Sequence, residues 1–81
     1  MTIFILVSAY SDDDGNFGGE VRGIFKTREE ARVALRKIHD DTLEDFMEPD
    51  DCCSDNYDYF DISEKDDIVI RTQVRIVEKE I

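Results

Sequence analysis

The sequence predicts a small α+β domain, with a four-stranded, mostly antiparallel sheet in the chain order β-β-α-β-β and one long helix packed on one face. Two observations support this fold class. Residues Thr27–Met47 repeat apolar side chains at helical spacing, and segments with the pattern of strands lie on both sides of them. A chain of 81 residues makes one compact domain, over 1–81. The single helix is then the only element that can cover the sheet.

The helix is predicted to begin at a capping box. Thr27 and Glu30 stand three residues apart, so each side chain can satisfy a free amide of the first turn. Apolar residues then return on one face, at Ala31, Ala34, Leu35, Ile38, Leu43 and Phe46. Pro49 follows soon afterwards and favours an end to the helix before it.

Two strands are predicted before the helix. Thr2–Tyr10 is apolar on both alternating faces, which is typical of a strand that is covered on both sides, and we expect it in the middle of the sheet. Ser11–Gly19 is a polar, glycine-rich connection, and Glu20–Phe25 returns as the second strand. The connection also suggests a calcium loop. Aligning Gly15 with the EF-hand glycine leaves unsuitable residues at both ends, so we expect no metal there.

The chain after the helix is predicted to contain a loop and two strands. Residues 48–56 form an acidic loop by composition. Tyr57–Ile62 is expected to be an edge strand, because its aspartates discourage pairing with other molecules. Ile68–Val77 alternates an apolar face with a mostly polar one, so its apolar face should pack beneath the helix.

Negative charge is concentrated in one part of the chain. The net charge is −11, and residues Asp40–Asp67 hold thirteen acidic residues against one lysine. Such a balance disfavours binding to nucleic acid or to an anionic membrane and favours basic partners. Acidic residues in the second half of a helix also oppose the helix dipole. Acidic runs are often only solvated surface, and this alternative stays open.

We expect the partner-binding surface in this acidic block. Carboxylates would steer a basic partner toward the surface, and interleaved aromatic side chains would anchor it. The predicted partner-binding residues are Asp40, Asp41, Glu44, Asp45, Phe46, Asp50, Asp51, Tyr57 and Tyr59. Carboxylates spread over a folded face can also imitate phosphates, so the protein would compete with nucleic acid for a basic groove, as a DNA mimic does.

No catalytic, cofactor or metal site is predicted. The adjacent Cys52 and Cys53, even with His39, supply too few zinc ligands at the wrong spacing. Neighbouring cysteines rarely form a disulfide with each other, which favours a reducing, cytoplasmic setting. The single histidine has no marked nucleophile as a partner, so we expect a protein that is not an enzyme. The apolar N-terminal run has the length of a strand, and nothing indicates a signal peptide or a membrane span.

One local run resembles known proteins. The segments Gly19–Phe25 and Thr27–Ala31 resemble small uncharacterised phage and bacterial proteins of β-β-α layout, in which a hairpin ends in an aromatic residue before the helix start. The resemblance covers residues 3–38 and implies no functional residue. In size and acidity the chain is also similar to phage anti-defence proteins, including anti-CRISPR inhibitors.

The leading interpretation is therefore a small, acidic, non-enzymatic binding protein that blocks a basic site on another macromolecule. The alternative is a small regulatory or structural interaction module, with a homodimer as one form. In the second case the acidity would only keep the domain in solution. The two interpretations differ in salt dependence, because electrostatic capture weakens with ionic strength and apolar association does not.

Overall fold

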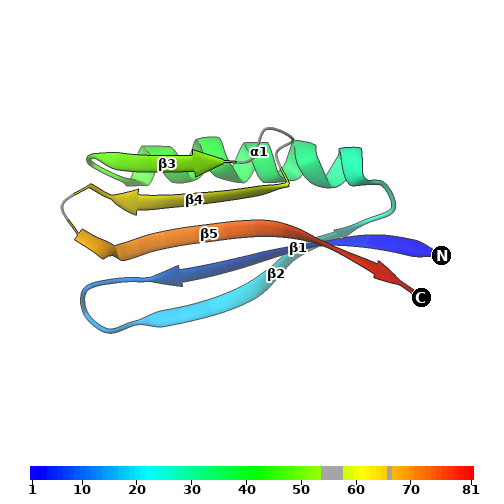
Figure 1. Cartoon of the computed structure of the whole chain (residues 1–81), viewed down its shortest axis with the longest axis horizontal. Coiled ribbons are helices and arrows are strands. Elements are labelled where there is room, and N and C mark those ends of the chain that lie inside the picture. The colour runs from blue at the N-terminus through cyan, green and yellow to red at the C-terminus, as the bar shows by residue number, and fades with distance from the viewer. Residues whose placement is uncertain (54–57, 66) are drawn as a thin grey trace.

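One antiparallel sheet and one helix make up the computed structural model, which describes residues 1–53, 58–65 and 67–81 (Figure 1). The strands are β1 (Thr2–Ser11), β2 (Phe17–Phe25), β3 (Pro49–Cys53), β4 (Tyr59–Glu64) and β5 (Asp67–Glu80), and the helix is α1 (Arg28–Asp45). Their order across the sheet is β2-β1-β5-β4-β3, and each neighbouring pair is antiparallel. The molecule measures 42 × 24 × 16 Å, so it is a slab one sheet and one helix thick.

The predicted fold, a four-stranded sheet with one long helix packed on it, is wrong. The sheet has five strands, and strands hold most of the chain. The additional strand, β3, lies inside the predicted acidic loop 48–56 and pairs with β4 from Pro49 opposite Glu64 to Cys53 opposite Phe60. Its composition is that of a loop, yet β4 offers a free edge for it to pair with. The carboxylate of Glu64 also accepts hydrogen bonds from the amides of Met47 (2.8 Å) and Glu48 (3.2 Å), which hold the chain where β3 begins.

The central position belongs to β5 and not to the first strand. β5 lies between β1 and β4, and β1 lies between β2 and β5. The segment predicted as an edge strand forms β4, which β3 covers on its outer side. Strand β1 therefore has hydrogen-bonding neighbours on both sides, although it is not the middle strand.

The predicted helix start is confirmed at its cap. The hydroxyl of Thr27 accepts a hydrogen bond from the amide of Glu30 at 3.2 Å, as in the first half of a capping box. The helix ends at Asp45, two residues earlier than predicted, and Phe46 forms its C-cap. In the part of the chain that the structure describes, no helix is both long and apolar enough to cross a bilayer.

The hydrophobic core lies between the helix and one face of the sheet. Its fully buried members are Leu6, Leu35, Phe60, Ile62 and Val74, one from each of β1, α1 and β5 and two from β4. The packing predicted beneath the helix is confirmed for Val74, whereas Ile70 and Ile76 are half-buried. The side chain of Ile68 lies outside the described residues.

The other face of the sheet is open. Its apolar sheet patch consists of Ile5, Val7, Val21, Ile24 and Val77. In the ladder, Ile5 lies opposite both Ile24 and Val77, and Val7 lies opposite Val21, so the patch crosses three neighbouring strands. Ile24 is 63% exposed and Val21 is 59% exposed. The first strand is thus apolar on both faces, as predicted, but no described element covers the second face.

Candidate functional site

The second half of α1 presents unpaired acidic residues to solvent. We name Asp41, Glu44, Asp45 and Glu48 the acidic stripe, because they follow the three- and four-residue spacing of one helix side and its extension. All four are exposed, and their side chains form no hydrogen bond or ion pair with described residues. The last turn of the helix carries no basic residue. The stripe therefore adds its charge to the negative end of the helix dipole.

The other helical acid, Asp40, belongs to an internal contact. His39 is 8% exposed, with Asp40 3.2 Å from its Nδ1 and Asp51 of β3 2.7 Å from its Nε2. Its ring meets Phe60 edge-on, with 5.1 Å between centroids. Through Asp51 this histidine joins the helix to β3, whereas Asp40 is its neighbour on the same helix and keeps a side chain that is 67% exposed. Of the predicted set, Asp50 lies opposite Ser63 and is exposed.

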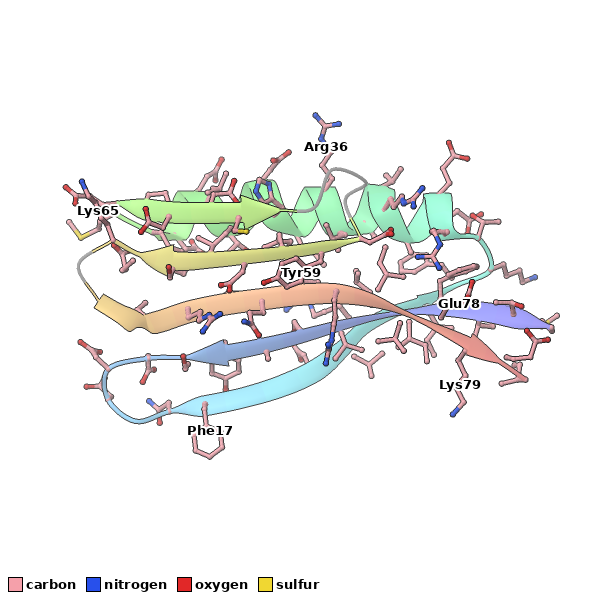
Figure 2. The ribbon with its side chains drawn as sticks, in the orientation of Figure 1. Phe17, Arg36, Tyr59, Lys65, Glu78 and Lys79 are labelled. Atoms are coloured by element: carbon pink, nitrogen blue, oxygen red, sulfur yellow. The ribbon has the colours of Figure 1, made fainter. Side chains whose placement is uncertain are left out.

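The predicted aromatic anchors do not lie with the acidic stripe. Phe46 is half-buried and packs against the hydrophobic core. Tyr59 lies on the open face of the sheet (Figure 2), where its hydroxyl donates to Asp61 at 3.3 Å. Partial burial, together with that carboxylate, raises the pKa of Tyr59. Tyr57 lies outside the described residues. The large apolar side chain beside the stripe is instead Met47, which is 93% exposed.

Beside the acidic stripe the molecule has a groove of about 440 Å³. The groove lies between the second half of α1 and the β1–β2 hairpin, on the side of the sheet that carries the helix. Its lining includes the apolar side chains Ile38, Phe46, Ile70 and Val74, together with Tyr10. Its volume lies within the range of small-ligand sites in proteins.

Charged residues line both sides of this groove. Asp41 and Asp45 stand on the helix side, Glu20 and Arg22 stand on the β2 side, and Arg71 of β5 also belongs to the lining. Arg22 binds Glu20 at 2.8 Å, so these two charges neutralise each other. Ser8 of β1 also lines the groove and is only 7% exposed. Its hydroxyl has no hydrogen-bond partner among the described residues.

Local backbone features shape the hairpin side of the groove. The β1–β2 register shifts between Leu6 and Val7, so Arg22 is an additional residue in β2. Farther along, Gly18 lies opposite Tyr10, and a Cβ at Gly18 would stand 2.9 Å from the Tyr10 ring. The absent side chain leaves room for the tyrosine at the end of the groove.

Arginines neutralise other members of the acidic block. Asp61 accepts from Arg71 Nε at 3.0 Å and from Gln73 at 3.2 Å, and the arginine bond is the main cause of the lowered pKa of Asp61. Asp58 accepts from Arg32 Nε at 2.8 Å and pairs with Arg28 at 3.4 Å. The Arg32 bond is likewise the main cause of the lowered pKa of Asp58. These acids are thus unavailable to a partner, unlike those of the acidic stripe.

Among the described residues, metal-ligating side chains gather in the β1–β2 turn. Asp12, Asp13 and Asp14 in the β1–β2 turn have ligand atoms within 4.8 Å of one another. The turn itself uses Asp12, whose Oδ1 accepts from the amides of Asp14 and Asn16, both at 3.0 Å. Cys52 is a free, exposed thiol, and the side chain of Cys53 lies outside the described residues.

Sequence reasoning identified Asp41, Glu44 and Asp45 as exposed acids but missed the groove. Ser8 and Tyr10 reach it from a strand, and Ile70 reaches it from the other end of the chain. Helical spacing was the available signal for the helix wall of the groove, because it places Asp41 and Asp45 beside Ile38 and Thr42 on one side of the helix.

Comparison with known proteins gives a family and no function. No curated protein and no solved structure matches the chain. A family model described as a domain of unknown function, DUF7336, matches residues 1–73, which are most of the chain. The protein therefore belongs to the DUF7336 family.

Proposed function

We propose that this protein is a non-enzymatic binding protein whose acidic stripe blocks a basic site on another macromolecule. The observation that carries the proposal is the set of exposed carboxylates of Asp41, Glu44, Asp45 and Glu48, which no described residue neutralises. Two other acids of the block, Asp58 and Asp61, are paired with arginines, whereas the stripe keeps negative charge that is available to a partner. A nucleic-acid-binding groove is one such basic site.

Steering and capture would both act in this binding. A net charge of −11 draws a basic partner from a distance, and salt screens that attraction over about 8 Å at physiological ionic strength. The helix dipole adds to the field at the C-terminal end of α1, where the stripe lies. Exposed single charge pairs contribute little, so several carboxylates must act together for useful affinity.

A charge-reversal experiment tests the proposal. The probe is a peptide of nine arginines, titrated calorimetrically into the protein at low and physiological salt. We expect the double variant Glu44→Lys/Glu48→Lys to weaken binding about tenfold, which corresponds to about 1.4 kcal/mol. The control is Asp13→Lys/Asp14→Lys, which makes the same change of net charge in the exposed β1–β2 turn, outside the stripe.

Comparison of the two variants decides the outcome. If the stripe is the binding surface, the control keeps most of the wild-type affinity while the stripe variant loses it. Equal losses in both variants would mean that only net charge matters, and the proposal would then be wrong. Circular dichroism checks that both variants fold, which is expected because all four side chains are exposed.

A second candidate function rests on the apolar sheet patch. Ile5, Val7, Val21, Ile24 and Val77 form an uncovered apolar surface across three strands, as an interface between two copies would require. That side of the slab measures up to 42 × 24 Å, which leaves room for the roughly 800 Å² per partner of a standard interface. The second candidate is thus a homodimeric interaction module, and its test is the oligomeric state in solution.

For the compartment we infer the cytoplasm. Cys52 is free and exposed, and such a thiol is stable in a reducing environment.

A further inference from the structure

We infer that the groove beside the acidic stripe binds a guanidinium or ammonium group on an apolar stem, as in the side chain of arginine or lysine. The inference rests on the proposed function and deepens it, because it names the part of a basic partner that the protein grips. It begins from the groove of about 440 Å³ between α1 and the β1–β2 hairpin.

The charges of the groove favour a cation. Of its other charged lining residues, Glu20 is already paired with Arg22 at 2.8 Å, and Arg71 is paired with Asp61. Asp41 and Asp45 have no partner among the described residues, and they stand four apart on the helix, where two like charges repel each other. A bound cation would remove that repulsion and supply the missing counter-charge.

Ser8 provides an observation that is independent of the acids. Its side chain is only 7% exposed, lines the groove and forms no hydrogen bond with a described residue. No side-chain oxygen or nitrogen of the described residues is both fully buried and without a partner, so the Ser8 hydroxyl oxygen reaches the water of the groove. A ligand with several N–H donors would replace that water, since the hydroxyl oxygen of Ser8 can accept.

The apolar lining fits the rest of the ligand. Ile38, Phe46, Ile70 and Val74 offer hydrocarbon surface against which three or four methylene groups would pack. Tyr10, 51% exposed, adds an aromatic ring, a favoured neighbour for a cation. A small inorganic cation would leave this surface unused, so the groove suits an organic cation better.

The experiment uses NMR titration of the full chain with N-acetyl-argininamide. We expect this probe to shift the amide signals of Ser8, Thr42 and Asp45, which line the groove, with millimolar affinity. N-acetyl-citrullinamide has nearly the same shape without the charge and should shift them much less. Equal shifts with both probes would overturn the inference.

Variants locate the binding within the groove. Asp45→Asn keeps the shape and removes one charge, so we expect at least a fivefold weaker affinity. Asp50→Asn makes the same charge change at an exposed position outside the groove and should change nothing. Ser8→Ala should weaken binding about twofold to threefold. If Asp50→Asn weakens binding as much as Asp45→Asn, the groove is not the site.

A further arm separates the two sources of such a cation. Butylguanidinium carries the same single charge and a similar stem without a peptide backbone. Binding of the blocked amino acid at least as tight as that of butylguanidinium supports a polypeptide side chain as the ligand, whereas preference for butylguanidinium supports a free small cation in the same groove. Absence of binding by both overturns the inference. The Glu44→Lys/Glu48→Lys experiment lies outside the groove lining, so it tests the acidic stripe separately.

Discussion

At the scale of single residues, Asp61 shows how this acidic protein uses its arginines. Its carboxylate lies on the open face of the sheet with a side chain only 13% exposed. It accepts hydrogen bonds from Arg71, Gln73 and the hydroxyl of Tyr59. These donors, led by Arg71, lower its pKa in the folded protein.

We predict that Asp61→Asn destabilises the protein at neutral pH and removes part of its sensitivity to acid. A carboxyl whose pKa is lowered by folding contributes stability above its unfolded pKa and loses it as pH falls through the folded pKa. The free energy of unfolding of the variant should therefore be about 1–2 kcal/mol lower than that of the wild type at pH 7. This difference in free energy of unfolding between wild type and variant should become smaller below about pH 4.

Urea unfolding at a series of pH values measures this gap. Asp50→Asn is the control, because Asp50 is exposed and has no partner among the described residues. A gap between wild type and Asp61→Asn that stays constant down to pH 2 would show that the ionised carboxylate contributes nothing specific.

At the scale of elements, the helix buries one face against the sheet and leaves the other in solvent. Leu35 is fully buried and contributes the helix's part of the core cluster. Val33 on the same helix is 68% exposed. Leu35 is thus completely buried and Val33 is mostly exposed, although both are apolar and only two positions apart.

We predict that Leu35→Ala costs about 2–5 kcal/mol of stability, because it removes buried methyl groups and leaves a cavity. Val33→Ala should change stability by less than about 0.5 kcal/mol, as exposed substitutions do. Chemical denaturation followed by circular dichroism compares the two variants. Similar losses at both positions would mean that the helix does not bury the face assigned to it.

The sequence allowed α1 to be predicted from local information, whereas β3 required long-range information. The Thr27 cap and the spacing of apolar residues are properties of the helix alone. In β3, Pro49 and its neighbouring aspartates indicate a loop, and the strand forms because β4 offers an edge and His39 binds Asp51. The same distinction explains the groove, whose exposed acids were predicted and whose hairpin wall was not.

At the scale of the whole molecule, the slab is covered on one side only. The apolar sheet patch and the acidic stripe belong to opposite sides of it, since the stripe extends the helix and the patch lies on the open face. A homodimer through the patch would therefore leave two acidic stripes facing outward. The two candidate functions are compatible in geometry.

We predict that the wild-type protein self-associates in a concentration series measured by analytical ultracentrifugation. Ile24→Lys should keep it monomeric, because it places a charge within the apolar sheet patch. Val33→Lys adds the same charge at an exposed apolar residue on the helix and should leave association unchanged. Wild-type protein that stays monomeric at about 1 mM would exclude a dimer of useful affinity.

The β1–β5 ladder has a consequence for how fast this chain folds. It aligns Thr2 with Glu80 and Ser11 with Arg71, and it joins the two ends of the sequence in the interior of the sheet. Contacts of such long sequence separation require the closure of a large loop, which slows the search for the native topology. During synthesis β1 leaves the ribosome before β5 and cannot pair with it until β5 has also emerged. Its two apolar faces are exposed in that interval, when the nascent protein is most vulnerable to aggregation.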